Sequence, residues 1–342
     1  MANMKQVAKK CGVSVATISR VINHPECVLP STRDRIIAIM EELNYIPNEQ
    51  ARSLTLNCTS TIALLIPNIL NPLYPQIAKG VEDICHQKSY SLLLCNTEQN
   101  IEKERAYIDM LIKRKVDGLV LSSSLLNKED IEKIKLHNIP LVMIGENKDS
   151  VSTNMVYTDY ELGVYQAITH FIEIGYKKIA FIGSSGNELE SAQKQRGYEK
   201  ALNEFSLPIN KDYMIIGDNE VEGGYFSAKK LLQLNPPPEA IFACNDLMAI
   251  GAIDAIKNEG LRIPQDIAII GFDDIKMASL VEPKLTTVSQ PVYKMGLIAA
   301  RLLFDIIGNK DEEGYLQKIF LEPKLKIRIS CGHYDRVREI FS

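Results

Sequence analysis

The sequence predicts a small all-α unit followed by an α/β core of two lobes, each built on a doubly wound parallel sheet. The first 58 residues carry apolar side chains at helical spacing. From Thr61 onward, short continuous apolar runs alternate with helical stretches over about 280 residues, a pattern typical of parallel sheets. A chain of 342 residues is also long enough for two or three units of ordinary size.

The first predicted helix lies in the stretch MKQVAKKC. One of its faces carries the apolar residues Met4, Val7, Ala8 and Cys11. Gly12 breaks this helix, and Ser14 offers a side-chain oxygen as the N-cap of the next one. The pattern therefore predicts two short helices joined by a glycine turn.

The second predicted helix runs to about Asn23. Its apolar face consists of Ile18, Val21 and Ile22, which leaves Val15, Ala16, Ser19 and Arg20 on other faces. A third helix is predicted after LPS, with Ser31 and Asp34 at the spacing of a capping-box variant. Its predicted apolar stripe is Ile36, Ile37, Met40 and Leu43.

Seven apolar runs predict strands that are buried on both faces. They are TIALLIP, YSLLLC, DGLVLSS, PLVMIG, KIAFIG, AIFACN and IAIIGF. Ligands of such sheets bind beyond the carboxyl ends of the strands. In a two-lobed core these ends commonly face a shared cleft, where we expect the ligand.

Composition restricts the class of protein further. The formal charge is -4, while residues 1–58 hold seven Lys/Arg against five Asp/Glu, a net +2 that permits DNA contact at the N-terminus. The start MANMKQVAKK lacks the apolar segment of a signal peptide, and no apolar run reaches about 18 residues, so we expect a cytoplasmic protein without membrane partners. The seven cysteines include no C-x-x-C pair, which disfavours a zinc site or a disulfide framework.

Signatures of enzymes and cofactors are missing from the sequence. It contains no G-x-G-x-x-G after a strand, no Walker loop, no H-E-x-x-H and no G-x-S-x-G. We therefore expect no catalytic residue, metal or cofactor. The acidic pair Asp273 and Asp274 directly follows the run IAIIGF, and its two carboxylates point apart, available for sugar hydroxyls, a cation or no ligand.

The stretch GVSVATISRV has two interpretations. As a DNA reader, it places Arg20 for a bidentate bond to a guanine edge. Its short polar side chains, Ser14, Thr17, Ser19 and Asn23, suit phosphate oxygens. The alternative is a small helical cap on a larger domain, because any helix pair with a glycine turn fits the pattern.

In its motifs the whole chain resembles the lactose-repressor (LacI/GalR) family of bacterial transcription regulators. The motifs occur in order and cover nearly every segment. They are VAKKCGVSVATISRVIN, RDRIIAIMEELNYIPNEQARSL, IPNILNPLYPQIAKGVED, KVDGLVL, CNDLMAIGAIDAIKNEGLRIPQDIAIIGFDDI and EPKLTTVSQPVYKMG.

The resemblance implies a homodimer whose helix-turn-helix reads a near-palindromic double-stranded operator. Arg20 matches the guanine-contacting position, and Val15 with Ala16 matches the variable pair that selects bases. Phosphate or docking positions are matched by Thr17, Ser19, Asn23, Tyr45 and Asn48. In the implied hinge helix, Asn48 to Leu56, Ala51 packs against its dimer mate and Leu54 wedges into the minor groove.

For the core, the resemblance implies a periplasmic-binding-protein-like fold with an effector in the cleft. Matching cleft positions are Tyr74, Asn245, Asp273 and Gln290, and Asp246 also fits the pattern. Three positions depart from it: Gly145 stands where an acid is frequent, Lys194 where an arginine is usual, and Asn219 where an aromatic is common. These departures weaken the prediction of a neutral sugar held by bidentate bonds and stacking.

Two hypotheses remain open for how operator binding is controlled. In one, a carbohydrate-derived effector such as a sugar, sugar acid or sugar phosphate binds in the cleft, and Lys194 is the counter-ion of an anion. In the other, a serine-phosphorylated phosphocarrier protein binds the helix YKMGLIAARLL, as in the catabolite-control branch. Tyr293 and Arg301 fit that branch, but Lys294 replaces an acid, so we favour the small molecule.

The predicted organisation has three parts. Residues 1–47 form the helix-turn-helix domain, 48–59 the hinge helix and linker, and 60–342 the effector-binding and dimerisation core. Within the core, lobe 1 takes about 60–158 and 290–320, and lobe 2 about 159–289 and 321–342. We expect a repressor of carbohydrate-utilisation genes, not an enzyme.

Overall fold

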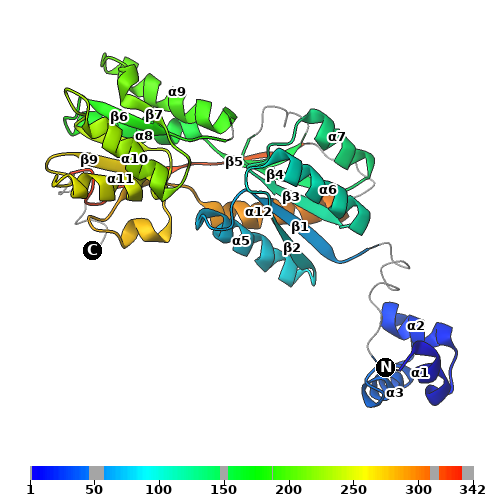
Figure 1. Ribbon diagram of the computed structural model, residues 1–342. Helices are drawn as coiled ribbons and strands as arrows, with labels where there is room; N and C mark the ends of the chain where they lie inside the picture. Colours follow the sequence, from blue (N-terminus) through cyan, green and yellow to red (C-terminus); the bar gives the residue numbers. More distant parts are fainter. Residues whose placement is uncertain (1, 46–57, 147–152, 187, 309–315, 333–342) are drawn as a thin grey trace. The chain divides into compact units, whose positions relative to one another are not determined.

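A computed structural model describes residues 2–45, 58–146, 153–186, 188–308 and 316–332 (Figure 1). The chain divides into two compact units, Met1–Ser60 and Thr61–Ser342. The predicted hinge, with Asn48, Ala51 and Leu54, lies outside the described residues.

The described part of the first unit consists of three helices and a short 3-10 turn. They are α1 (Met4–Cys11), α2 (Val15–Asn23), η1 (Pro25–Cys27) and α3 (Pro30–Glu42). Gly12 ends α1 with φ of 65°, a left-handed conformation that glycine adopts without steric cost. The Ser14 side chain accepts a hydrogen bond from the backbone N–H of Thr17 at 3.1 Å, which confirms the predicted N-cap of α2.

A small core holds these helices together. Its buried residues are Val7, Ala8, Cys11, Ile18, Val21 and Ile36, as the helical spacing predicts.

Two predictions for α3 are wrong. The helix begins at Pro30, whose fixed φ suits the first helical position, so Ser31 is not its cap. Ile37 is 42% exposed, because α3 buries Ile36 fully and the apolar residues beside it only in part.

The second unit contains two six-stranded sheets with the same strand order. The first sheet runs β2-β1-β3-β4-β5-β11 and the second β7-β6-β8-β9-β10-β12. All neighbouring strands are parallel except β10 and β12. The order 2-1-3-4-5 is that of a doubly wound sheet, so the predicted fold class is confirmed.

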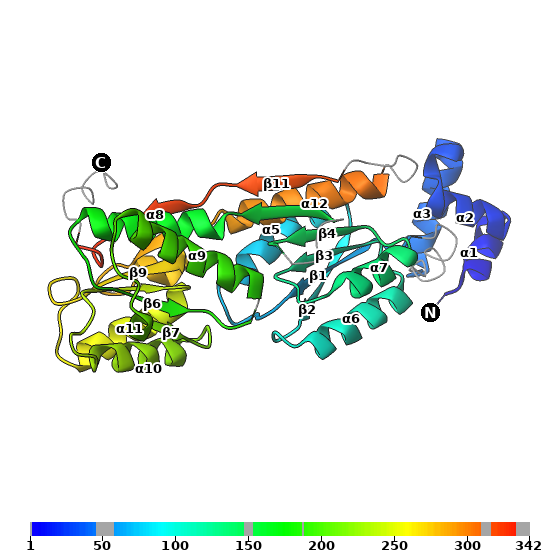
Figure 2. The same ribbon diagram turned by 90° about the horizontal axis from the view of Figure 1, so that it is seen from above.

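The first lobe is the first sheet with four helices. Its strands are β1 (Thr61–Ile66), β2 (Ser91–Asn96), β3 (Gly118–Ser122), β4 (Leu141–Ile144), β5 (Asn154–Thr158) and β11 (Lys318–Leu321). Its helices are α5 (Leu73–Gln87), α6 (Ile101–Arg114), α7 (Lys128–Leu136) and α12 (Val292–Gly308). Figure 2 shows α5 and α12 on one face of this sheet and α6 and α7 on the other.

The second lobe repeats this plan. Its strands are β6 (Ile179–Gly183), β7 (Met214–Ile216), β8 (Ala240–Ala243), β9 (Ala268–Asp273), β10 (Thr286–Ser289) and β12 (Lys324–Lys326). Its helices are α8 (Tyr160–Glu173), α9 (Glu188–Glu204), α10 (Val221–Leu232) and α11 (Asp246–Asn258), with the turns η3 (Lys211–Tyr213) and η4 (Lys276–Ser279). The chain crosses between the lobes after β5, β10 and β11.

Alternate residues of β1 explain why its apolar run is unbroken. Ile62, Leu64 and Ile66 pack with α5 and α12, whereas Ala63 and Leu65 pack with α6 and α7. A strand covered on both faces has no solvent side for polar residues. The prediction that both faces of the strand are buried is wrong for β2, an edge strand whose Leu94 is 36% exposed.

Helices α5 and α12 approach closely through glycine. A Cβ atom at Gly80 would lie 2.3 Å from the backbone oxygen of Tyr293, and one at Gly296 would lie 2.3 Å from that of Ile77. The two backbones therefore pack at a distance that only glycine permits. Within the described part of the chain, no helix is long and apolar enough to cross a membrane.

Candidate functional site

Helix α2 presents a face of small side chains and one arginine. Ile18 and Val21 are buried and fix the helix in the core of its unit. On the outer faces Val15, Ala16 and Arg20 are exposed, so the guanidinium is accessible to a ligand. A helix of this kind can enter the major groove, where Arg can pair with guanine and small apolar groups can contact thymine methyls.

The predicted phosphate-contacting residues flank this face. The Ser14 and Thr17 hydroxyls lie 2.9 Å apart, and Asn23 Nδ2 donates to Ser19 Oγ at 3.3 Å. These bonds orient short polar groups at both ends of α2. Tyr45 is half-buried against the helical core, which holds the end of α3 in place.

A polar cavity lies between the two lobes of the core, and we call it the interlobe cavity. All five predicted ligand-binding residues line it: Tyr74, Lys194, Asn245, Asp273 and Gln290. Three of them stand at carboxyl ends of strands, since Asn245 follows β8, Asp273 ends β9 and Gln290 follows β10. The cavity is therefore where a doubly wound sheet binds its ligand.

Asp273 is held in an unusual environment. Its φ of 111° is disfavoured for a residue with a Cβ atom, and strain of this kind costs of order 1–3 kcal/mol. Its Oδ1 accepts a hydrogen bond from Gln290 Nε2 at 2.8 Å. Burial raises the pKa of Asp273 to about 7, against the opposing effect of Lys194. Carboxyl groups with a pKa raised in this way are common at functional sites.

The neighbouring acid Asp274 has a different role. It pairs with Lys326 and Arg328, which hold its pKa below the ordinary value although burial works in the other direction. The two adjacent carboxylates therefore do point apart, and only Asp273 lines the interlobe cavity.

Asp246, which also fits the family pattern, does not line the cavity. It is fully buried at the start of α11 and accepts hydrogen bonds from the Ile275 N–H at 2.8 Å and the Thr287 hydroxyl at 2.6 Å. It therefore connects α11 with the segment after β9 and with β10. Its role is to hold the second lobe together behind the cavity.

Two amides form one side of the cavity. Asn245 caps α11 by accepting from the Met248 N–H at 2.8 Å, and its Nδ2 donates to the Asn219 backbone oxygen at 3.2 Å. Asn219 in turn donates to the Ser185 carbonyl at 2.6 Å. Asn219 thus supplies hydrogen-bonding groups where an aromatic face was expected from the resemblance.

Lys194 is not available as an unpaired counter-ion. Its ammonium donates to Glu190 Oε1 at 2.7 Å and to the Cys244 carbonyl at 3.0 Å. It also lies 4.5 Å from the centroid of the Phe272 ring. Burial disfavours its charge, but the field of Glu190 and Asp273 outweighs burial and raises the pKa of Lys194. The positive charge is therefore already balanced inside the protein.

Most of the charged side chains that line the interlobe cavity are acidic. Glu190, Glu220 and Asp273 line it, and Lys194 is the one Lys or Arg among its described lining residues. Burial raises the pKa of Glu220, as do Asp218 and Glu222, while a hydrogen bond from Asn68 lowers it. With Glu190 and Lys194 cancelling, the remaining charge is negative and opposes an anionic ligand.

Two side-chain contacts join the lobes beside the cavity. Asn68 Nδ2 in the first lobe donates to Glu220 Oε1 in the second at 2.9 Å. Glu146 in the first lobe accepts from Gln193 Nε2 in the second. Any change in the angle between the lobes must break or lengthen these bonds.

Several cavity residues were not predicted. Glu190, Glu220, Tyr160 and Ser123 all line the cavity. Glu190 stands four residues before Lys194 on α9, and this i,i+4 spacing was a usable signal for an ion pair. Gly145, where an acid was expected, is not among the described lining residues.

A helical unit with an exposed arginine face, followed by a two-lobed core around a polar cavity, defines a DNA-binding regulator controlled by a ligand. Comparisons with known proteins agree with this class. Residues 3–48 match the model described as "Bacterial regulatory proteins, lacI family", and residues 168–331 match a "Periplasmic binding protein-like domain". The chain belongs to the LacI family of bacterial regulatory proteins.

Two relatives align with most of the chain. The HTH-type transcriptional repressor PurR of Pasteurella multocida (strain Pm70) is 37% identical over 331 residues, 96% of this chain and 98% of the repressor. Catabolite control protein A of Priestia megaterium is 37% identical over 298 residues, 87% of this chain and 90% of that protein. The protein is accordingly a transcription regulator of this family.

Solved structures share the architecture. The lac repressor dimer bound to operator and the anti-inducer ONPF has a TM-score of 0.85 and 25% identity, covering 96% of this chain and 99% of that one. The complex of the transcriptional regulator CelR with cellobiose has a TM-score of 0.71 and 28% identity, covering 96% and 100%.

Proposed function

We propose that this protein represses carbohydrate-utilisation genes by binding a near-palindromic operator as a homodimer. The observation that carries the proposal is the outer face of α2, where Arg20 is exposed beside Val15 and Ala16 while Ile18 and Val21 hold the helix in its core. Arg20 would pair with a guanine, and the two small residues would select neighbouring bases. Ser14, Thr17, Ser19 and Asn23 would contact phosphates.

The homodimer is supported by a related structure whose assembly is known. The related lac repressor binds its operator as a dimer. A two-fold symmetric dimer matches a palindromic site, because each α2 then meets an equivalent half-site.

For the effector, the cavity chemistry favours a neutral polyhydroxylated compound over a sugar acid or a sugar phosphate. An anion would have to displace Glu190 from Lys194 and would face Glu220 and Asp273. Hydroxyl groups, by contrast, can donate to these carboxylates and accept from the surrounding amides. The related regulator CelR binds the neutral sugar cellobiose, which agrees with this preference.

Control of DNA binding would arise from the angle between the lobes. An effector that bonds to both walls of the interlobe cavity favours one lobe arrangement, and the Asn68–Glu220 and Glu146–Gln193 contacts stabilise the arrangement of this structure. In the dimer, that arrangement would set the spacing of the two DNA-binding units. The effector thereby changes operator affinity without touching DNA.

A second candidate is control by a serine-phosphorylated phosphocarrier protein. It is favoured by the 37% identity to Catabolite control protein A and by the exposure of Tyr293 and Arg301 on α12. Tyr293, however, donates to Asp83, which also pairs with Lys79. This surface therefore also carries an acidic side chain, which does not favour a phosphorylated partner. Binding of the phosphorylated carrier, measured by calorimetry against the unphosphorylated form, decides between the candidates.

The main proposal is tested by two experiments. Selection of bound sequences from random duplex DNA, followed by a mobility-shift assay, is expected to give a near-palindrome with a guanine in each half-site. A thermal-shift screen against neutral sugars, sugar acids, sugar phosphates and nucleosides is expected to raise the melting temperature with a neutral sugar. Binding of a sugar phosphate with no neutral hit would contradict the effector class while leaving the DNA function intact.

A further inference from the structure

The segment that joins β3 to α7 forms part of the wall of the interlobe cavity. Ser123 and Leu125 line the cavity, and Leu126 lines a groove between α6 and α7. Ser123 has φ of 48°, a left-handed conformation that residues with a Cβ atom rarely adopt. A backbone strained in this way persists only where surrounding contacts fix it.

Glu104 of α6 supplies the contacts that fix this segment. Its side chain is buried, with 2% of the residue exposed, and lies behind the wall instead of in the cavity. It accepts hydrogen bonds from Ser124 Oγ at 2.6 Å and from the Leu125 N–H at 3.0 Å. Burial raises the pKa of Glu104, and these two bonds work in the opposite direction. The carboxylate and the segment therefore stabilise each other.

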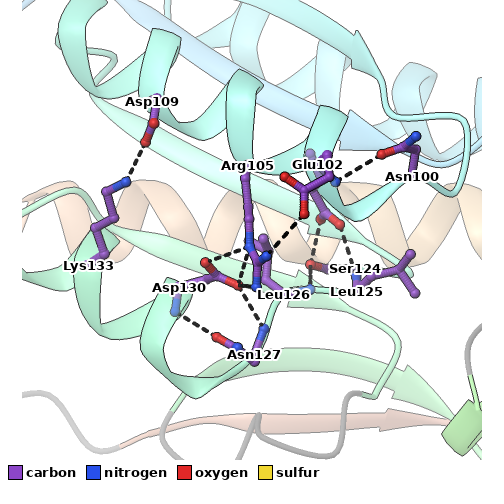
Figure 3. Close-up of polar contacts among 11 residues, drawn as sticks. Asn100, Glu102, Arg105, Asp109, Ser124, Leu125, Leu126, Asn127, Asp130 and Lys133 are labelled. Carbon is purple, nitrogen blue, oxygen red and sulfur yellow. Dashed lines mark hydrogen bonds and ion pairs between the residues drawn. The ribbon is translucent and has the colours of Figure 1, made fainter.

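The next residue of α6 anchors the far end of the same segment. Arg105 donates from Nε and Nη2 to Asp130 at 3.1 Å each, a planar two-bond pair (Figure 3). Asp130 accepts from the Asn127 N–H at 3.2 Å, and its own N–H donates to Asn127 Oδ1 at 3.0 Å, forming the capping box of α7. Two consecutive residues of α6 thus hold residues 124–127 from behind.

The front of the wall contacts a ligand-binding position. Tyr74 is partly buried and lines the cavity together with Ser123. Burial raises the pKa of the Tyr74 phenol, and the neighbouring Ser123 side chain works in the opposite direction. A displacement of the segment would therefore reach Tyr74 through Ser123. The path from Glu104 runs through its hydrogen bonds to Ser124 and Leu125 and then along one short stretch of backbone to Ser123.

We propose that Glu104 is a positioning residue of the interlobe cavity, which holds the strained segment so that Ser123 and Leu125 present a fixed surface to the effector. The importance of this surface for regulation rests on the proposed function, but its dependence on Glu104 is a property of the free protein. Loss of the carboxylate lets the segment relax and changes the cavity without removing any lining residue.

The test compares Glu104→Gln with Glu132→Gln in the full chain. Glutamine keeps the size of Glu104 but lacks the charge and the second acceptor oxygen. Glu132 on α7 is a half-exposed glutamate that pairs with Lys135 and not with the segment, so its variant is a matched control. Amide hydrogen exchange by NMR reports the Leu125 N–H. The Tyr74 environment is read from ¹⁹F NMR of fluorotyrosine-labelled protein, assigned with Tyr74→Phe.

Glu104→Gln is expected to accelerate exchange of the Leu125 amide roughly tenfold or more, the effect of losing a charged hydrogen bond, and to shift the Tyr74 resonance. Glu132→Gln is expected to do neither. Unchanged exchange at Leu125, or faster exchange throughout α6 with Tyr74 unmoved, would show that Glu104 only fills space and would overturn the proposal.

A second variant keeps the test decisive if Glu104→Gln does not fold. Ser124→Ala removes one donor to Glu104 and is expected to shift Tyr74 in the same direction by a smaller amount. An unmoved Tyr74 resonance in Ser124→Ala would overturn the proposal. None of these measurements requires an effector, so failure of the sugar screen and failure of this proposal are separate results.

Discussion

Replacing Asp273 by Asn should change how the stability of the core depends on pH. Burial raises the pKa of Asp273 to about 7 from an ordinary value of 3.8, so the folded state binds its proton over a range where the unfolded chain releases it. Stability contributed by this proton is complete below the unfolded pKa and is lost as the pH rises through about 7. Asparagine carries no titratable proton and can still accept the bond from Gln290.

The magnitude follows from the two pKa values. Between pH 5 and pH 7 the wild-type protein loses about 2.3 kcal/mol from this group, and the loss levels off above pH 7. The wild type should therefore lose about 2.6 kcal/mol more than Asp273→Asn between pH 5 and pH 8. Acids remote from Asp273 titrate alike in both proteins and cancel in the difference, whereas the pKa of Asp246, which burial and then Asp273 raise, differs between them.

Urea unfolding at pH 5, 6, 7 and 8 measures this difference. Thirteen of the 14 tyrosines belong to residues 61–342 and the chain has no tryptophan, so tyrosine fluorescence reports on the core. Asp266→Asn is the control, because Arg262 lowers the pKa of Asp266 to about 2 and that group stays ionised at every pH tested. Parallel curves for wild type and Asp273→Asn would refute the buried, proton-binding carboxyl.

Three further substitutions test other parts of the structure. Arg20→Ala should weaken binding to the selected operator by about 1–3 kcal/mol in a mobility-shift assay and leave the melting temperature unchanged, because the side chain is exposed; equal loss for random DNA would contradict base reading. Lys194→Met should destabilise the core by about 3–5 kcal/mol in urea unfolding, since it removes the buried ammonium that pairs with Glu190 and donates to the Cys244 carbonyl; restored stability in Lys194→Met with Glu190→Gln would support this reason. Gly80→Ala should destabilise by about 1–3 kcal/mol, because its Cβ would lie 2.3 Å from the Tyr293 oxygen; an unchanged melting temperature would contradict the close packing of α5 and α12.

Much of the fold was predictable because its signals are local. The turn at Gly12 and the cap at Ser14 follow from conformational preferences of single residues, and the structure contains both. The apolar runs predicted strands β1, β2, β3, β4, β6, β8 and β9. The remaining strands are short or mixed in polarity, as in β5, where Asn154 and Tyr157 are only partly buried, so they gave no comparable signal.

The candidate site was predictable only in part. Tyr74, Asn245, Asp273 and Gln290 were placed by resemblance to a family. The last three meet because strand ends lie at one edge of the second sheet, whereas Tyr74 reaches the cavity from α5 of the first lobe. The resemblance also suggested Asp246, which the structure assigns to a buried bond network within the second lobe. A motif identifies a position in the chain but not the partner of each side chain.

The sequence by itself determined the class of fold and the helix that exposes Arg20, since periodicity and capping depend on residues a few positions apart. Only the tertiary structure decided that Lys194 donates to the Cys244 carbonyl in a cavity lined by further acids, and that Glu104 supports the cavity wall. These contacts join different helices and strands through the folded core. Their free energy depends on burial and on distances between residues remote in sequence, and neither quantity exists until the chain has folded.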